Sequence, residues 1–414
     1  MKTLIFEVSK YAQLHLAWES VKRNKKSSPG IDQQTLEDFN SNLRKNLLNI
    51  SKELKSNKYL FSPALEAKIP KKTKSEFRKI NLFTLRDKIV QKSIQITLEK
   101  QRKNGSFFPY IRNNVSIGFL SKRDYKELVG IRKAIKQVKS NYKKGYTVVT
   151  AADIKDFFPN IDRVMLYKTI IKVLPDKTIN KLIEDCLTPE VLERDRFKPD
   201  NYNALTSSGV AQGSILSPLF SNIYLMKFDK ELEENKIPVI RYADDVLIFS
   251  TVPTKADETL KKVNEILLSS SLLEFYPKGG SKEPKHYPLK RFGIYLGLQF
   301  QIKKNRWEIF PIQKKVDELI KNIHDILNPY TKQTFLERVV YLELSINSWF
   351  NTYRNIGCTK KILNNIFNSV ELEYFLYINK ILKHKGIIQD YVPKQKIQFL
   401  TDFRYGKSRV SKRK

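Results

Sequence analysis

Two adjacent carboxylates interrupt an apolar stretch near the middle of the chain, in the segment Arg241–Ser250, which reads RYADDVLIFS. The stretches on either side, Pro238–Ile240 and Val246–Phe249, are mostly β-branched or aromatic, which predicts two strands joined by a tight turn. Burying Asp244 and Asp245 at such a turn without a partner would be unfavourable. A divalent cation would remove that penalty, because Mg²⁺ and Mn²⁺ prefer oxygen ligands. A solvent-exposed turn would explain an Asp-Asp pair considered alone.

A third carboxylate ends another apolar stretch upstream. The segment Thr147–Ile154 reads TVVTAADI, which predicts a short strand that ends at Asp153. Two-metal phosphoryl transfer needs carboxylates that converge from separate strands. Taken alone, Asp153 could be an ordinary turn residue. Together with the predicted Asp-Asp hairpin it indicates a two-metal site, which only a folded sheet could assemble.

Around these carboxylates, four segments resemble the motifs of reverse transcriptases, in the same order. They are DIKDFF at 153–158 (motif A), GVAQGSILSP at 209–218 (motif B), YADD at 242–245 (motif C) and YLGLQF at 295–300 (motif E, the primer grip). The resemblance implies an α+β right-hand polymerase fold, with fingers, a palm built on a small antiparallel sheet, and a helical thumb. It implies an RNA-directed DNA polymerase whose catalytic residues are Asp153, Asp244 and Asp245. The same three residues and Ile154 would hold two Mg²⁺ ions, or Mn²⁺.

The resemblance also implies a set of residues that bind the incoming nucleotide: Lys71, Arg78, Phe158, Gln212 and Lys282. Lys71 and Arg78 have the spacing of the family's triphosphate clamp, and an arginine fork suits phosphate oxygens. Ordinary surface cations are the alternative. Phe158 falls where the family carries an aromatic side chain that excludes a ribose 2′-hydroxyl, although Phe157 or Phe158 could instead belong to the core.

Gln212 falls on the motif B glutamine that contacts the nucleotide. Motif D normally supplies a lysine near the triphosphate, and three lysines lie in the segment 277–288. We take Lys282 for this role, with Lys278 and Lys285 as alternatives.

The resemblance divides the chain into four parts. Residues 1–120 are expected to form an N-terminal extension and the fingers, 121–305 the palm with motifs A to E, 306–395 a helical thumb and 396–414 a basic tail. Further segments resemble the group II intron-type branch of reverse transcriptases: SPGID at 28–32, LRDKIVQ at 85–91, NVSIGF at 114–119 and SWFNTYR at 348–354. No nuclease motif or zinc-binding cysteine set follows the thumb. The profile is therefore most similar to stand-alone, defence-associated reverse transcriptases, which act with a neighbouring non-coding RNA.

The net charge of the chain is consistent with an RNA partner. The chain has 414 residues, with 76 lysines and arginines against 43 acidic residues, a net charge of +33. Such an excess indicates a polyanionic partner, of which nucleic acid is the simplest. We expect an RNA template, a DNA product and dNTPs as partners. No apolar run is long enough to span a membrane, and the two cysteines form no disulfide framework, so we expect no membrane association and a cytoplasmic protein.

Several alternatives stay open at this stage. The protein could be a group II intron-type reverse transcriptase and maturase, or a template-independent or protein-primed DNA polymerase of the abortive-infection type. An RNA-dependent RNA polymerase would have a similar palm, but the aromatic residue at Phe158 argues against it. A catalytically idle maturase would not need all three carboxylates. The template, the priming mode and the oligomeric state are not indicated by the sequence.

Overall fold

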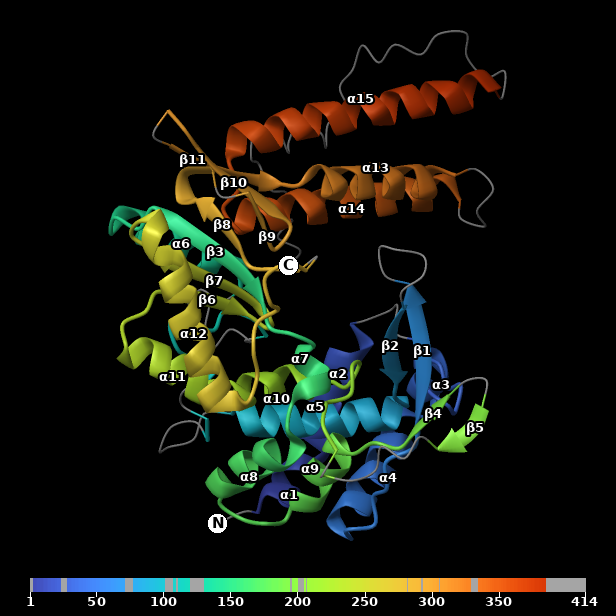
Figure 1. Ribbon diagram of the computed structural model, residues 1–414. Helices are drawn as coiled ribbons and strands as arrows, with labels where there is room; N and C mark the ends of the chain where they lie inside the picture. The colour runs from blue at the N-terminus through green and yellow to red at the C-terminus, as the bar shows by residue number, and fades with distance from the viewer. Residues whose placement is uncertain are drawn as a thin grey trace. The chain divides into compact units, whose positions relative to one another are not determined.

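The computed structural model describes residues 3–23, 28–70, 77–100, 107–108, 111–119, 130–193, 196–199, 205, 207–280, 282–291, 293–304, 306–328 and 334–384. It has the expected α+β composition, with small sheets surrounded by helices (Figure 1). The chain divides into two compact units, which we describe separately. The first comprises Met1–Gly130 and Thr150–His286, and the second comprises Ile131–Val149 and Tyr287–Lys414.

The first unit begins with a group of helices and a small sheet. The helices are α1 (Leu4–Ser9), α2 (Tyr11–Lys22), α3 (Leu36–Ser41), α4 (Leu43–Lys55) and α5 (Leu85–Glu99). The sheet has the order β2-β1-β4-β5, formed by β1 (Ala64–Pro70), β2 (Phe77–Leu82), β4 (Val191–Glu193) and β5 (Arg196–Pro199). The β1–β2 pair is antiparallel, whereas β1 and β4 run parallel.

A second four-stranded sheet carries the sequence features of interest. Its order is β6-β7-β3-β8, formed by β3 (Val148–Asp153), β6 (Val239–Tyr242), β7 (Asp245–Ser250) and β8 (Lys285–Pro288). The accompanying helices are α7 (Phe157–Asn160), α8 (Arg163–Val173), α9 (Asn180–Leu187), α10 (Ser217–Tyr224), α11 (Met226–Glu234) and α12 (Ala256–Ser271). The expected helix after motif B is present, but it divides at Leu225, which has non-helical backbone angles.

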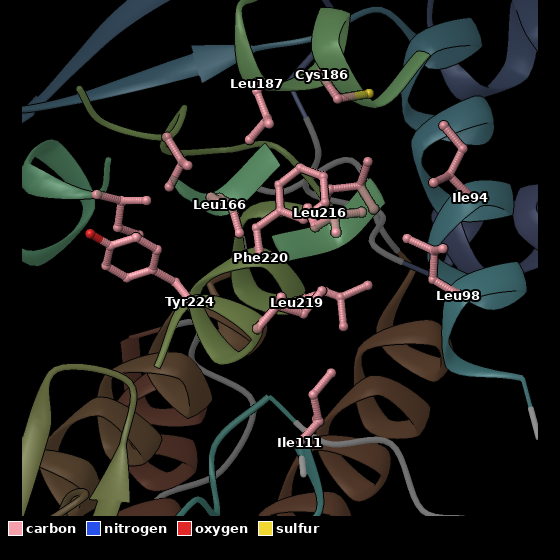
Figure 2. Close-up of a cluster of buried hydrophobic side chains, with 14 of the residues drawn as sticks. Ile94, Leu98, Ile111, Leu166, Cys186, Leu187, Leu216, Leu219, Phe220 and Tyr224 are labelled. Atoms are coloured by element: carbon pink, nitrogen blue, oxygen red, sulfur yellow. The ribbon is translucent and has the colours of Figure 1, made fainter. Parts of the chain in front are cut away.

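The core of the first unit lies where α5, α8, α9 and α10 meet. Figure 2 shows their buried side chains converging, among them Leu98 of α5, Leu166 of α8 and Phe220 of α10. Cys186 of α9 lies in the same cluster, and burial raises the pKa of its thiol well above the usual value. Cys186 is therefore an inert core thiol, as the sequence indicated.

The second unit is mostly helical. It contains α6 (Ile131–Lys143), α13 (Gln313–Leu327), α14 (Phe335–Asn355) and α15 (Lys360–His384), with a three-stranded sheet of order β11-β10-β9. These strands are β9 (Ile294–Tyr295), β10 (Leu298–Lys303) and β11 (Arg306–Pro311). Helices were expected from residue 306 onward, but β11 pairs along its full length with β10. The period-2 burial of Ile309 and Pro311 on β11 fits a strand.

Helix α14 begins at a capping box, because the side chains of Thr334 and Glu337 each accept a hydrogen bond from the other residue's backbone. Helix α13 lies in the segment expected to be helical and buries an apolar stripe that includes Val316, Leu319 and Ile323. Among the described residues, no helix is long and apolar enough to cross a membrane. The predicted basic tail, 396–414, lies outside the described residues.

Candidate active site

The hairpin β6–β7 forms as the sequence predicted. Tyr242 pairs with Asp245, so Ala243 and Asp244 make the turn. Ala243 has a positive φ of 58° and is buried. That backbone conformation is uncommon outside glycine, asparagine and aspartate. The turn packs closely against Gly118, because a Cβ added to Gly118 would lie 3.1 Å from the Ala243 nitrogen.

The end of β3 is hydrogen-bonded to this turn. The backbone N–H of Ile154 donates to the Asp244 carbonyl at 3.0 Å. On the other side, the N–H of Tyr276 donates to the Asp153 carbonyl at 3.1 Å. Because β3 also neighbours β7 in the sheet, the carboxylates Asp153 and Asp245 are brought together from segments far apart in the chain.

The charge of Asp153 acts on both carboxylates of the turn. The pKa of Asp245 is raised to about 7 by burial, by the charge of Asp153, by a hydrogen bond between the Asp153 and Asp245 side chains, and by Asp244. Burial and Asp153 also raise the pKa of Asp244, although the residue as a whole is exposed. A carboxyl pKa raised by burial and by neighbouring carboxylates means that the site has more negative charge than its surroundings compensate.

A divalent cation fits this imbalance, since its charge would compensate the carboxylates and its preferred ligands are oxygens. Asp153, Asp244 and Asp245 offer carboxylates, while Ile154 can offer only its backbone carbonyl oxygen. Among the described residues, no three acidic, histidine or cysteine side chains already form a metal cage. Side-chain rotation of the carboxylates would therefore have to complete a coordination shell.

Two of the predicted nucleotide-binding cations lie near the carboxylates. Arg78 of β2 and Lys282 both oppose the rise in the pKa of Asp244, so their charges act at this turn. Lys278 instead forms an ion pair with Asp257, at 2.7 Å. Lys71 lies outside the described residues.

The side chain of Lys282 is held by Tyr276. Its Nζ lies 3.3 Å from the Tyr276 hydroxyl and 4.6 Å from the centre of that ring. The same hydroxyl donates to Asp156 at 3.0 Å. Burial lowers the pKa of Lys282, but Tyr276 and the charges of Asp153 and Asp156 outweigh it and raise the pKa overall. Sequence reasoning missed Tyr276, which belongs to none of the motifs and precedes Lys282 by six residues in the loop between α12 and β8.

Phe157 and Phe158 take different places in α7. Phe157 is buried in the core, with 3% of its surface exposed, whereas Phe158 is partly buried at the core's edge. Their rings stack with centroids 5.4 Å apart. The Phe158 carbonyl accepts a hydrogen bond from Val210 at 2.9 Å, which attaches motif A to the start of motif B. One of the two rings therefore belongs to the core, and Phe158 is the one that is partly accessible.

The motif B loop is fixed from two sides. The Gln212 carbonyl accepts a hydrogen bond from the Asn81 N–H of β2 at 2.6 Å. The side-chain oxygen of Gln91 on α5 accepts hydrogen bonds from Ser214 Oγ at 3.2 Å and from the Ile215 N–H at 3.1 Å. These bonds position the backbone on both sides of Gly213. Gln212 thus lies where the Arg78-bearing strand meets motif B.

A buried ion pair under the catalytic turn was also missed by sequence reasoning. Arg241 and Asp229 are almost fully buried and lie 2.6 Å apart. An arginine within an otherwise apolar strand was the available signal, because a buried arginine needs a partner.

Comparison with known proteins bears on this site. Residues 69–274 match the family model described as reverse transcriptase (RNA-dependent DNA polymerase). The chain is 29% identical over 276 residues to the group II intron-encoded protein LtrA of Lactococcus lactis subsp. cremoris, covering 64% of this chain and 41% of LtrA. It is 30% identical to the putative COX1/OXI3 intron 2 protein of Saccharomyces cerevisiae, covering 55% of this chain and 24% of that protein. It is 26% identical to protein YkfC of Escherichia coli, covering 50% of each.

Two solved structures are similar to a lesser degree. A chain of a partial Cas6-RT-Cas1–Cas2 complex has a TM-score of 0.37 and 22% identity, covering 64% of this chain and 42% of that one. A chain of the Cas6-RT-Cas1–Cas2 complex has a TM-score of 0.38 and 17% identity, covering 91% of this chain and 51% of that one. The chain thus spans half or less of the length of the curated relatives named above.

Proposed function

Because residues 69–274 belong to the reverse transcriptase family, we propose that this protein is an RNA-directed DNA polymerase that synthesises cDNA from dNTPs on an RNA template. The observation that carries the proposal is the position of Asp153 beside the β6–β7 turn: the Ile154 N–H donates to the Asp244 carbonyl at 3.0 Å, and β3, which ends at Asp153, neighbours β7, which begins at Asp245. Arg78 and Lys282 act on the same turn with positive charge. This arrangement suits a metal-bound nucleoside triphosphate, because its metal ions would bind the carboxylates and its phosphate groups would bind Arg78 and Lys282.

Each group has a role in nucleotidyl transfer. Asp153, Asp244, Asp245 and the Ile154 carbonyl would hold two Mg²⁺ ions, which when bound would activate a hydroxyl nucleophile and neutralise the leaving pyrophosphate. Arg78 binds phosphate oxygens, with Lys71 as its predicted partner in the clamp. Lys282 binds the triphosphate as a point charge held in place by Tyr276.

Phe158 and Gln212 select and orient the sugar and base. Phe158 is partly accessible at the edge of the core, so its ring can lie beneath the sugar and exclude a 2′-hydroxyl. Gln212 is held at the junction of β2 and motif B by its own carbonyl, which leaves its side chain to contact the nucleotide. Together these roles favour a DNA polymerase over an RNA polymerase.

The proposal is tested by removing the two carboxylates of the turn. We expect Asp244→Ala combined with Asp245→Ala to abolish cDNA synthesis on a primed RNA template, because neither remaining ligand alone can hold the ions. The matched control is Asp317→Ala with Glu318→Ala, which removes two adjacent carboxylates from an exposed part of α13. A double variant at the turn that folds and still extends the primer would overturn the proposal.

The biological setting we propose is a dedicated structured non-coding RNA as template, in antiphage defence. The positive charge of the chain and the family of its polymerase segment support an RNA partner. The second candidate is an intron-type reverse transcriptase and maturase, which the similarity to LtrA favours. Phage plaque counts on cells carrying the wild type or the Asp244→Ala, Asp245→Ala variant decide between them: only a defence enzyme lowers plaque numbers, and only while its carboxylates are intact.

A further inference from the structure

A buried polar network lies directly beneath the catalytic turn. Arg241 of β6 donates from Nε and Nη2 to the two carboxylate oxygens of Asp229 on α11, at 2.8 and 2.6 Å. Both side chains are at most 1% exposed. The Asp229 carboxylate also accepts a hydrogen bond from Asn113 Nδ2 at 2.9 Å. An ion pair this deep is held by several charge-assisted hydrogen bonds.

The third nitrogen of the Arg241 guanidinium reaches the turn itself. Nη1 lies 3.3 Å from the Ala243 carbonyl and 3.3 Å from Asn222 Oδ1. Asn222 in turn donates to the Gly118 carbonyl at 3.0 Å. Gly118 packs against the Tyr242–Ala243 backbone so closely that a Cβ there would lie 3.1 Å from the Ala243 nitrogen. The network therefore contacts the turn through Arg241 and supports the segment behind it through Asn222.

Stability alone gives little reason for such a pair. Replacing a buried ion pair by apolar residues of similar size is often neutral or stabilising, because the charges no longer have to be desolvated. The Ala243 backbone, however, is in an uncommon left-handed conformation, which persists only where the surroundings impose it. The Arg241 side chain donates a hydrogen bond to the Ala243 carbonyl.

We propose that the Arg241–Asp229 pair, with Asn222 and Asn113, is a positioning device that sets the turn so that Asp244 and Asp245 can share metal ions with Asp153. This inference rests on the proposed function, because its kinetic test measures primer extension. Arg241 and Asp229 touch neither nucleotide nor metal: they act through the Ala243 carbonyl. The competing view is that the pair only stabilises the junction of β6 and α11.

The test replaces the pair by apolar residues of similar volume, Arg241→Met with Asp229→Leu. We expect a thermal midpoint close to that of the wild type, a kcat for primer extension lower by about 100-fold, since a displacement of about 1 Å can have that effect, and a higher Mg²⁺ concentration for half-maximal rate. Affinity for the RNA–primer duplex should not change. The control is Lys227→Gln with Glu231→Gln, which removes an ion pair from the same helix in which Lys227 is exposed and Glu231 is partly buried.

The measured kcat and Mg²⁺ dependence distinguish a positioning role of the ion pair from a purely structural one. Wild-type kcat and Mg²⁺ dependence in the folded apolar variant would show that the pair is only structural. If that variant does not fold, Arg241→Lys is used instead, because a lysine keeps the ion pair but cannot also reach the Ala243 carbonyl. Loss of kcat with a raised Mg²⁺ requirement in the lysine variant supports the proposal, and unchanged values overturn it.

A failure of the proposed function is recognised separately. If the wild type extends no primer, Mn²⁺ binding to the wild type and the apolar variant is compared by electron paramagnetic resonance, with Asp244→Ala, Asp245→Ala as the blank. Weaker Mn²⁺ binding in the apolar variant still supports positioning of the turn. Equal binding overturns it.

Discussion

The folded protein disfavours the negative charge of Asp245. Its pKa rises from 3.8 to about 7 on folding, mainly through burial and the charge of Asp153. A raised carboxyl pKa means that the folded state retains a proton that the unfolded state has lost. In the absence of metal, this residue therefore makes the protein less stable as the pH rises from about 4 to about 7.

We expect Asp245→Asn to raise the thermal midpoint of the protein in EDTA at pH 8, because asparagine never takes on the unfavourable charge. The difference from the wild type should disappear at a pH well below 3.8, where Asp245 is protonated in both states. Added Mg²⁺ at pH 8 should stabilise the wild type more than the variant. Differential scanning fluorimetry measures all three effects, and an equal response of both proteins to pH and Mg²⁺ would contradict them.

Phe158 is expected to determine the choice of sugar. Its ring is partly accessible, whereas the ring of Phe157 is buried and stacked behind it. Phe158→Val should therefore raise rNTP incorporation relative to dNTP incorporation, measured as the ratio of kcat/KM values. Phe157→Val is the matched control, and it should lower stability by about 1–4 kcal/mol through a core cavity without changing the ratio. A change in the ratio for Phe157→Val alone would assign the role to the other ring.

At the scale of elements, the contact between strand β2 and the motif B loop holds Gln212 in place. Gly213 has a φ of 112°, and a Cβ built on it would lie 2.3 Å from the Asn81 carbonyl oxygen. Any side chain at this position must therefore push the loop away from β2. The hydrogen bond from the Asn81 N–H to the Gln212 carbonyl would be disturbed with it.

We accordingly expect Gly213→Ala to lower kcat/KM for dNTP by about 100-fold, since a shift of about 1 Å near the nucleotide can have that effect. Gly279→Ala is the matched control, because Gly279 also has a positive φ, of 89°, but no atom lies within 4 Å of its added Cβ. Both variants carry backbone strain, so a comparable loss in the two would show that strain, and not contact with β2, is the cause. Single-nucleotide incorporation measures the effect.

At the scale of the whole molecule, the net charge of +33 predicts how RNA is bound. Each phosphate contact releases a bound cation from the RNA, so affinity falls steeply with salt. We expect the dissociation constant for structured RNA to rise by at least about 1,000-fold between roughly 50 and 200 mM salt. Fluorescence anisotropy measures this dependence, and a shallow one would mean that few phosphates are contacted.

Specificity for one RNA is a separate question from affinity. A dedicated template would be read through loops and unpaired bases, because the major groove of A-form duplex is too deep and narrow for side chains. Immunoprecipitation followed by sequencing should recover one dominant small RNA and its cDNA. A broad set of cellular transcripts without cDNA from a single locus would indicate non-specific binding by a basic surface.

The sequence by itself determined the local elements of the site. The β6–β7 hairpin, the strand that ends at Asp153 and the helix after motif B all follow from short-range alternation, spacing and turn residues, which act over a few neighbours. The stripe on α13 follows from the same local pattern. Strand β11 within the segment expected to be almost entirely helical could not be predicted in this way, because its pairing with β10 is a contact between strands that the residues after 306 do not reveal alone.

Only the tertiary structure decided which distant residues meet. The approach of Asp153 to Asp245, the hydrogen bond between the Asn81 N–H and the Gln212 carbonyl, and the Arg241–Asp229 pair under the turn all join residues that belong to different strands, helices or loops. Burial and the sum of neighbouring charges produce the raised pKa of Asp245, and both are properties of the packed chain. A sequence motif names the carboxylates, but the fold sets their distances and their dielectric surroundings, and these determine how strongly the site needs a cation.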